Sequence, residues 1–448
     1  MSIELESLNL TVKDVEQAVK KHHVDKGGGK FQVIEYEIKS LDSEVPGGLL
    51  SSNYLLKVKI REKRVTYTDM KDCNGDDSSE GSHEEQSCSF FIKCFPQEEF
   101  NMKYAQDLSI YQKERKLYEQ LIPRLQDVGL GHAPWSPRCY HTKGDTVIIL
   151  QNLQAENFVK CRLESSVLDF EHLAIALKTL ARLHAASIAV EERTRSEIPK
   201  LYPHLLDENG YPENHGENGY RQKGVRLMTK TILELVKVLP GYDDWDINET
   251  LEAFPEVINR IYDLVKPSEK YRNVMNQADL WSSNILFKYE DDKPIDSRLV
   301  DFQFSRYAPP AYEIATLLTV SNTKDFREKH EKELLDIYYE ALDAELSLYG
   351  FVTEDLLNRD DFLQSYEDYR LAGLIESLLF NQIIFLPMDF WTEMTESSEK
   401  FQDFMLNRHT EICLNAYENN EFYRKKIREL LRETIDSYVL KSEFDARL

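Results

Sequence analysis

Three oxygen-bearing side chains surround a short apolar hairpin in the second half of the chain. Asp279 and Asn284 come just before the apolar run 285–287, and Asp301 comes just after a second apolar run, 299–300. The charged segment between the runs is typical of a turn. An antiparallel hairpin places the start of its first strand beside the end of its second. The sequence therefore predicts that Asn284 lies next to Asp301, with Asp279 on the loop that leads into Asn284.

Such a group could hold a metal ion beside a phosphorylated substrate. Mg²⁺ typically takes one or two carboxylates and completes its shell with substrate phosphates. Asp279 could then accept a proton from a substrate hydroxyl group. The alternative is that Asp279 and Asn284 cap turns, as Asp and Asn often do. Spacing alone leaves both interpretations open.

Composition narrows the class of protein. The 448 residues are 42% hydrophobic and 11% aromatic, which is typical of a globular protein with two or more domains or lobes. The net charge of -24 argues against a nucleic-acid backbone binder and against docking on an anionic membrane. We therefore expect no nucleic-acid partner.

The cysteines and the apolar segments indicate a cytoplasmic protein. Six cysteines form no C-x-x-C pair and no zinc pattern, which fits a reducing compartment. The amino terminus lacks a basic segment followed by an apolar core, so we expect no secretory signal. The most apolar late stretch, 378–391, is broken by polar residues and Pro387, so we expect no membrane span.

The order of predicted elements gives an α+β fold with two lobes. Residues 1–30 read as a helix capped at Thr11 and a Gly-rich linker. Alternating apolar residues predict a small antiparallel β-sheet lobe over 31–150, with an acidic surface insertion at 68–87. A helix through Tyr111 to Leu121 is expected to stop at Pro123. Helical spacing dominates 151–448, apart from the hairpin region 276–307. His184, on the first of these helices, is expected to be a packing or hydrogen-bonding residue and not a catalyst. We expect the hinge at 150–155.

The wording around the hairpin resembles a known family. The segments "NQADLWSSNILF" and "RLVDFQFSRYAPPAYEIA" are similar to the core of the insect ecdysteroid kinase-like family, including its juvenile hormone-inducible type members. That family is similar to choline kinases and aminoglycoside phosphotransferases, and more distantly to protein kinases. The resemblance implies a two-lobed protein-kinase-like fold with a sheet-based N-lobe and a helical C-lobe.

The resemblance also assigns roles to residues. It implies that Asp279 is the catalytic base and that Asn284 and Asp301 hold Mg²⁺. It implies that ATP is bound by Lys93 of "FFIKCFP", by its partner Glu114 of "YQKERKLYEQLIP", by the backbone at Gln151 and Leu153, and by the phosphate loop at Ser51, Ser52 and Asn53. Four further residues are expected to shape the site: Gln277, Gln303, Ser305 and Arg306. Arg306 could stabilise phosphate charge or form a structural pair with a carboxylate.

Three departures from the family wording bear on activity. Gln277 and Ala278 stand where the family has His-Gly; Gln keeps hydrogen-bonding ability but cannot become cationic. Ala278 is expected to have ordinary backbone angles unless the site is strained. The segment 51–56 replaces a glycine and a serine of the phosphate loop, and Gln151-Asn152 replaces Glu-Asp in the hinge.

The favoured function is an ATP-dependent kinase that acts on a hydroxyl group of a small, lipophilic molecule, such as an ecdysteroid or another hydroxylated metabolite or xenobiotic. One alternative is a pseudokinase that binds a nucleotide or ligand in a regulatory role. A carrier of lipophilic ligands is the third, although the retained metal pair argues against it. Acceptor contacts are expected from 366–391, a segment equally explained as core helices. We expect a monomer.

Overall fold

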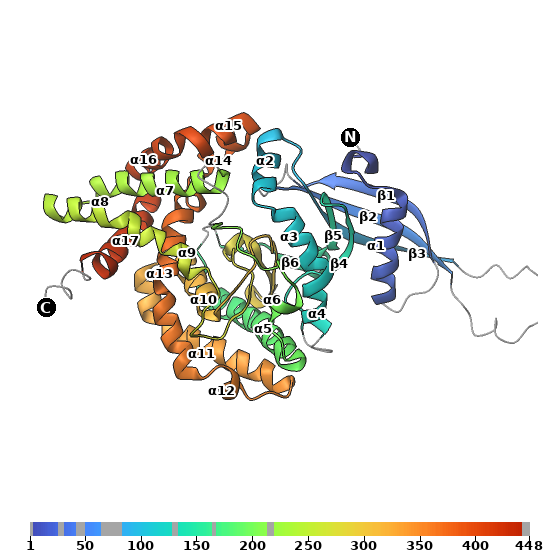
Figure 1. The fold of residues 1–448 in the computed structure, drawn as a ribbon. Helices are drawn as coiled ribbons and strands as arrows, with labels where there is room; N and C mark the ends of the chain where they lie inside the picture. The colour runs from blue at the N-terminus through green and yellow to red at the C-terminus, as the bar shows by residue number, and fades with distance from the viewer. Residues whose placement is uncertain are drawn as a thin grey trace, which may run out of the picture. The chain divides into compact units, whose positions relative to one another are not determined.

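The computed structural model describes residues 3–25, 31–41, 50–63, 83–127, 133–163, 167–212 and 219–440. The chain forms two compact units: Met1–Gln97 with Pro137–Glu156, and Glu98–Ser136 with Asn157–Leu448. The first is built on an antiparallel sheet and the second is mainly helical (Figure 1), so the predicted α+β class is confirmed. The division predicted from the sequence placed residues 98–136 in the sheet lobe, whereas in the structure they belong to the helical unit.

A five-stranded antiparallel sheet forms the first unit, in the order β1-β2-β3-β5-β4. Its strands are β1 (Phe31–Ser40), β2 (Ser52–Lys63), β3 (His83–Cys94), β4 (Cys139–Lys143) and β5 (Val147–Gln151). Alternate residues of β2 and β3 are buried in a core that includes Leu56, Val58, Ile60, Phe90 and Ile92. The predicted surface insertion falls partly outside the described residues, and its last part, from His83, belongs to β3.

Asp14 of helix α1 (Val12–Asp25) both caps the start of the helix and contacts the sheet. The amide and hydroxyl groups of Thr11 donate to Oδ2 of Asp14 over 2.7 and 2.6 Å, a reciprocal cap that satisfies the first turn. Lys143 and His141 of β4 also contact Asp14, at 2.7 and 3.1 Å. Burial raises the pKa of Asp14, but the hydrogen bonds from Lys143 and Thr11 outweigh it and hold this pKa well below its usual value.

The second unit surrounds helix α5 (Phe170–Thr194), which contacts α11 and the sheet strand β9. The other long helices are α7 (Tyr220–Lys237), α8 (Asp244–Asn259), α10 (Pro310–Ser321), α11 (Lys324–Leu348), α13 (Arg359–Ile384), α16 (His409–Asn419) and α17 (Glu421–Tyr438). Among the described helices, only α5 is by itself long and apolar enough to cross a membrane, and most of it is buried inside the unit. Helix α13 passes the same test only together with Met388–Met394, across a 74° bend.

The helix expected to stop at Pro123 continues past it. Helix α3 (Ile110–Lys116) passes into a π-helical turn, Leu117–Leu121, and then into α4 (Ile122–Asp127). Proline has no amide hydrogen and is tolerated where a helix begins or changes its hydrogen-bond spacing. The change of spacing directly before Pro123 explains why the expected stop is wrong.

Two small sheets in the second unit position the residues around the hairpin. Strand β7 (Val274–Asn276) pairs with β10 (Arg306–Ala308), and β8 (Ile285–Glu290) lies between β6 (Phe158–Val159) and β9 (Lys293–Leu299). All of these pairings are antiparallel. The segment between β7 and β8 therefore starts and ends on fixed strands.

Asp14→Asn should destabilise the first unit. The amide keeps the shape of the side chain but removes the charge that Lys143 and the Thr11 cap require, so the free energy of unfolding should fall by about 2 kcal/mol at pH 7. Because the folded-state pKa is depressed, this contribution is present above about pH 4 and is lost as the pH falls through the folded value. Urea unfolding at pH 7 and at pH 3 measures it. The exposed Glu37→Gln on β1 is the control, and equal stability of Asp14→Asn and wild type at pH 7 would contradict the assignment.

Candidate functional site

The β8–β9 hairpin brings two of the predicted metal ligands to one end. Ile285 pairs with Leu299 in the strand register. Beyond this pair, the amide of Val300 donates to the carbonyl oxygen of Asn284 over 3.0 Å. Asp301 is the next residue along the chain, so Asn284 and Asp301 lie at the same end of the hairpin. This is the juxtaposition that the sequence predicted.

Asp279 is joined to this pair through Asn284. Nδ2 of Asn284 donates to the backbone oxygen of Asp279 over 2.8 Å and to its carboxylate oxygen Oδ2 over 3.1 Å. Both hydrogen bonds use the amide nitrogen, which leaves the amide oxygen of Asn284 as the atom suited to a cation. The backbone of Asp301 is left-handed, with φ of 64°.

The donor set fits a hard cation held mainly by its substrate. Asn284 and Asp301 offer one amide oxygen and one carboxylate, which are ligands that suit Mg²⁺. Across the described parts of the chain, no group of three or more His, Cys, Asp or Glu side chains could hold a metal ion.

The charge of Asp279 depends on its neighbours. Burial is the largest influence and raises the pKa of the Asp279 carboxyl well above its usual value; the negative charges of Asp301 and Glu376 act in the same direction. The positive charge of Arg221 and the hydrogen bond from Asn284 act in the opposite direction. A cation beside Asp301 would offset one of the three influences that favour protonation.

Gln277 holds the loop before Asp279 with three hydrogen bonds. Its Nε2 donates to the backbone oxygens of Val300 and Asp301 over 2.8 and 2.7 Å. Its Oε1 accepts from the amide of Asp279 over 2.7 Å. The side chain is fully buried. A neutral amide therefore connects the two acidic segments of the site at the position where the family wording has histidine.

A second buried carboxylate, that of Glu313 on α10, also holds this loop in place. It accepts from the amides of Gln277 and Ala278 over 3.1 and 2.6 Å. His184 of α5 lies 3.3 Å from the same carboxylate and 2.7 Å from the hydroxyl of Tyr338. His184 is thus a buried hydrogen-bonding residue, as the sequence indicated. Glu313 received no role from the sequence, although it lies within the family wording.

Ala278 adopts the strained alternative. Its φ is 66°, in the left-handed region that favours glycine. Of the two outcomes that the sequence left open, ordinary backbone angles or a strained site, the structure shows the second. The carboxylate of Glu313 holds the two consecutive amides of Gln277 and Ala278, which keeps the loop in the shape that glycine would adopt without strain.

Two of the four residues expected to shape the site, Gln277 and Ser305, are hydrogen-bonded to each other, and Gln303 and Arg306 have partners of their own. The pairing of Asn276 with Arg306 in β7 and β10 places Gln277 next to Ser305, whose hydroxyl donates to the backbone oxygens of Phe302 and Gln277 over 2.9 and 3.5 Å. The backbone oxygen of Gln303 accepts from Asn209 over 3.0 Å.

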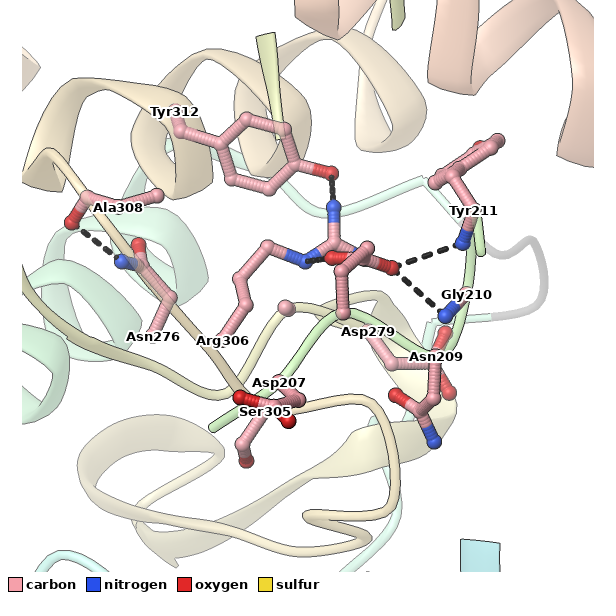
Figure 2. Close-up of polar contacts among 12 residues, drawn as sticks. Asp207, Asn209, Gly210, Tyr211, Asn276, Asp279, Ser305, Arg306, Ala308 and Tyr312 are labelled. Carbon is pink, nitrogen blue, oxygen red and sulfur yellow. Dashed lines mark hydrogen bonds and ion pairs between the residues drawn. The ribbon is translucent and has the colours of Figure 1, made fainter. Parts of the chain in front are cut away.

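Arg306 is a structural partner of carboxylates. Its Nε lies 3.0 Å from Glu208 and its Nη1 lies 3.7 Å from Glu376, and it also donates to the hydroxyl of Tyr312. Figure 2 shows its guanidinium group between Tyr312 and the segment that carries Gly210 and Tyr211. This pairing supports the second of the two predicted roles for Arg306.

Arg221 is the residue near Asp279 that the sequence gave no reason to select. It is buried at the start of α7, donates to the backbone oxygen of Gly210 over 2.7 Å, and lies over the rings of three aromatic residues. The distances from its guanidinium carbon to the ring centres are 5.3, 5.7 and 5.0 Å for Tyr211, Phe304 and Phe380. The three rings come from separate segments, so no spacing in the sequence indicates this cluster.

Helix α3 contacts the segment that follows Asp301. The carboxylate of Glu114 accepts from the amide of Phe302 over 3.2 Å. The neighbouring Lys113 donates to the backbone oxygen of Asp207 over 2.7 Å and to the side chain of Asn209 over 2.8 Å. Burial lowers the pKa of Lys113 to about 7. Through Glu114, the helix therefore fixes the backbone directly after Asp301.

The remaining predicted residues belong to the sheet unit. Lys93 of β3 lies between Asn53 of β2 and Ile148 of β5 in the register. The hydroxyl of Ser51 donates to the side chain of Asn53 over 3.4 Å, and Ser52 opens β2.

Gln151 is the last residue of β5, and its side chain accepts from the amide of Arg138 over 3.1 Å. The side chain of Asn152 donates to Ser89 over 2.9 Å, and Leu153 is buried. The two neutral hinge residues are thus used in local hydrogen bonds.

Ala278→Gly should increase stability. Glycine removes the cost of a left-handed alanine, partly offset by its greater freedom in the unfolded chain, for a net gain of about 0.5–1 kcal/mol. The control is Ala344→Gly on the exposed face of α11, where the same change should cost about 1 kcal/mol. Denaturant titration of both variants measures the difference. A loss of stability in Ala278→Gly would show that the loop does not carry this strain.

Gln277→Glu should destabilise the site although it barely changes shape. The substitution places a carboxylate oxygen against two backbone oxygens that Nε2 now satisfies, at a cost of about 2–4 kcal/mol. Because protonation would restore one donor, part of the loss should be recovered as the pH falls below the raised pKa of the new carboxyl group. Thermal unfolding at pH 8 and pH 5 tests this; a variant as stable as wild type at both values would contradict the described bonds.

Comparison with known proteins agrees with the sequence motifs around the site. The sequence profile of the ecdysteroid kinase-like family matches residues 67–351, which include β3, the hairpin and α10. A comparison with curated proteins finds no match.

Several solved structures are similar at low identity. A choline kinase from Cryptosporidium parvum Iowa II is 12% identical, with a TM-score of 0.42, over 91% of this chain and 92% of its own. A choline/ethanolamine kinase family protein from Mesorhizobium loti is 11% identical, with a TM-score of 0.36, over 94% and 99%. A microcompartment-associated aminopropanol kinase is also 11% identical, with a TM-score of 0.36, over 94% and 100%. Similarity at this level leaves the family match as the basis of the assignment.

The family match spans well over half of the chain and contains Asp279, Asn284 and Asp301. It agrees with the kinase-like α+β fold class predicted from the sequence. The chain belongs to the ecdysteroid kinase-like family.

Proposed function

We propose that this protein transfers a phosphoryl group from ATP to a hydroxyl group of a small molecule. The observation that carries the proposal is the convergence of Asp279, Asn284 and Asp301 at one end of the β8–β9 hairpin, with Asn284 bonded directly to Asp279. Phosphoryl transfer needs little covalent chemistry from the protein, because positioning and charge stabilisation supply most of the catalysis. A small, rigid set of oxygen ligands beside one carboxylate meets that need.

Each residue has a defined task in this proposal. Asp279 orients the acceptor hydroxyl and receives its proton, and Asn284 keeps the carboxylate in one orientation through its amide nitrogen. Asn284 and Asp301 hold Mg²⁺, which when bound supplies positive charge to the phosphates. Glu114 holds the backbone after Asp301 in place. Gln277 and Glu313 position the loop and take no part in proton transfer.

The nucleotide side of the proposal rests on family membership. Lys93 would hold the phosphates, with Glu114 as its ionic partner, and the backbone at Gln151 and Leu153 would meet the adenine ring. The phosphate loop would be Ser51, Ser52 and Asn53. These roles support ATP as the donor, and they are separable from the role of Asp279 by mutation.

The proposed acceptor is an uncharged, hydroxylated compound of the ecdysteroid type. Arg221 already fills the space over the rings of Tyr211, Phe304 and Phe380, and such a set of aromatic faces would otherwise favour a cationic ligand. Of the segment expected to contact the acceptor, Tyr366 is buried against Glu331 as a core residue. Glu376 belongs to the charged network beside Asp279.

The substitutions in the family wording are compatible with activity. Gln277 still connects Asp279 with the backbone of Asp301, and Ala278 still has the backbone shape of glycine. This observation favours an active enzyme over a pseudokinase that only binds nucleotide. The two differ in turnover and agree in nucleotide binding.

Asp279→Asn should abolish transfer without abolishing nucleotide binding. Labelled ATP and a set of hydroxylated steroids and other neutral alcohols provide the assay, and the variant should lose at least about 100-fold in rate. Asp291→Asn, at the exposed tip of the same hairpin, is the matched control and should keep full activity.

Thermal shift with Mg-ATP separates the other outcomes, because a bound ligand stabilises the folded state. Stabilisation of wild type without transfer to any acceptor would identify a pseudokinase. The absence of stabilisation would overturn both kinase interpretations.

A further inference from the structure

The segment that follows Asp301 depends on other parts of the chain for its shape. Residues 301–305, between β9 and β10, lie in neither a helix nor a strand, so their backbone groups need partners from elsewhere. The backbone oxygen of Gln303 accepts from the side chain of Asn209 over 3.0 Å. Asn209 belongs to 207–211, a segment for which the sequence indicated no role.

The side-chain amide of Asn209 is buried and uses both of its donor hydrogens and its oxygen. Its Nδ2 donates to the backbone oxygens of Gln303 and Leu108 over 3.0 and 2.9 Å. Its Oδ1 accepts from Nζ of Lys113 over 2.8 Å. The reverse orientation of the amide would place its oxygen against two backbone oxygens, so the three partners fix one orientation. Asn209 therefore joins α3 to the segment that contains Gln303.

The segment 207–211 is also held at Arg306, the first residue of β10. Nε of Arg306 lies 3.0 Å from the carboxylate of Glu208. The same carboxylate accepts from the amides of Gly210 and Tyr211 over 2.6 and 2.8 Å (Figure 2). There is little room at this contact, since a Cβ atom on Gly210 would lie 3.0 Å from Oε1 of Glu208 and 3.1 Å from Nη2 of Arg306. The segment is therefore fixed to β10 as well as to α3.

Two neighbouring residues of α3 thus hold the backbone beyond Asp301. Glu114 accepts from the amide of Phe302 directly, and Lys113 holds the side chain of Asn209, which binds the residue after Phe302. These bonds leave the left-handed backbone of Asp301, with φ of 64°, little freedom to turn. Groups that orient a metal ligand from behind contribute strongly to metal affinity.

We propose that Asn209 is a positioning residue for Asp301, the proposed ligand of Mg²⁺, and that it acts through the backbone of Gln303. The inference rests on the proposed function, because it concerns the affinity of the same site for Mg²⁺. Asn209 itself touches neither the metal nor the substrate. It limits the movement of 301–305, so that the carboxylate of Asp301 is already in place when the cation binds.

Asn209→Asp breaks this contact and nearly keeps the size of the side chain. A carboxylate oxygen would face the backbone oxygens of Leu108 and Gln303, whereas the contact with Lys113 would remain. Asn358→Asp, at the exposed N-cap of α13, is the matched control, since Asp caps a helix as well as Asn does. If Asn209→Asp fails to fold, Asn209→Ser removes the same two donations without adding a charge and takes its place.

Hydrogen exchange of the protein without nucleotide measures the positioning itself. In Asn209→Asp, the amides of 300–306 should exchange severalfold faster than in wild type, while those of α11 keep their wild-type rate. Asn358→Asp should exchange as wild type does in both regions. An unchanged rate at 300–306 would overturn the inference, and so would an equal increase in α11, which would indicate a general loss of stability.

The Mg²⁺ dependence of nucleotide binding measures the consequence for the site. Thermal stabilisation by ATP is followed as Mg²⁺ is titrated, and the concentration at half of the effect should rise at least about tenfold in Asn209→Asp. A residue with only a structural role would lower the unfolding temperature and leave this midpoint unchanged, and that result would overturn the inference. If Mg-ATP does not stabilise wild type, the proposed function falls, and the role of Asn209 toward Mg²⁺ falls with it, whatever the exchange result.

Discussion

The contact between the carboxylate of Glu313 and the amides of Gln277 and Ala278 is the constraint on which the candidate site depends. Glu313 is 1% exposed, so its charge needs strong donors, and two backbone amides and His184 surround it. Charge-assisted bonds of this kind contribute about 1.5–3 kcal/mol each. Because consecutive amides bind one carboxylate, the direction of the next residue, Asp279, is set by α10, a rigid core helix.

Gln277 extends this constraint from the loop to the segment around Asp301. One amide group donates to two backbone oxygens around Asp301 and accepts from the amide of Asp279, so the two acidic residues are tied through a neutral side chain. A cationic residue at this position would add positive charge between the two acidic residues, whereas Gln277 links them by hydrogen bonds without adding charge. The strain at Ala278 is tolerated because the bonds on either side determine its conformation. The departure from family wording thus changes the electrostatics of the loop more than its shape.

The parts that the sequence predicted are those with local or motif-level signals. Two apolar runs around a charged turn predicted the hairpin and hence the meeting of Asn284 with Asp301, and the spacing at Thr11 predicted the cap of α1. Glu313 and Arg221 were missed because their partners lie far away in the chain, and a lone Glu or Arg on a helix is usually solvated. The expected helix stop at Pro123 is wrong because a π-helical turn, which changes the hydrogen-bond spacing, comes directly before it. Tertiary partners decide such cases, and no periodicity encodes them.

The charges near Asp279 bear on the nature of the acceptor. Arg306 is paired with Glu208, while Glu376 accepts from the hydroxyls of Tyr211 and Tyr312 and lies 3.7 Å from Arg306. Arg221 adds one buried positive charge, which opposes the burial and the negative charge of Asp301 that raise the pKa of Asp279. A cationic acceptor would meet a guanidinium that already fills the aromatic faces, and its charge would be desolvated without a partner. An uncharged hydroxyl compound adds no charge to this network, so the buried charges around Asp279 are compatible with the neutral acceptor proposed above.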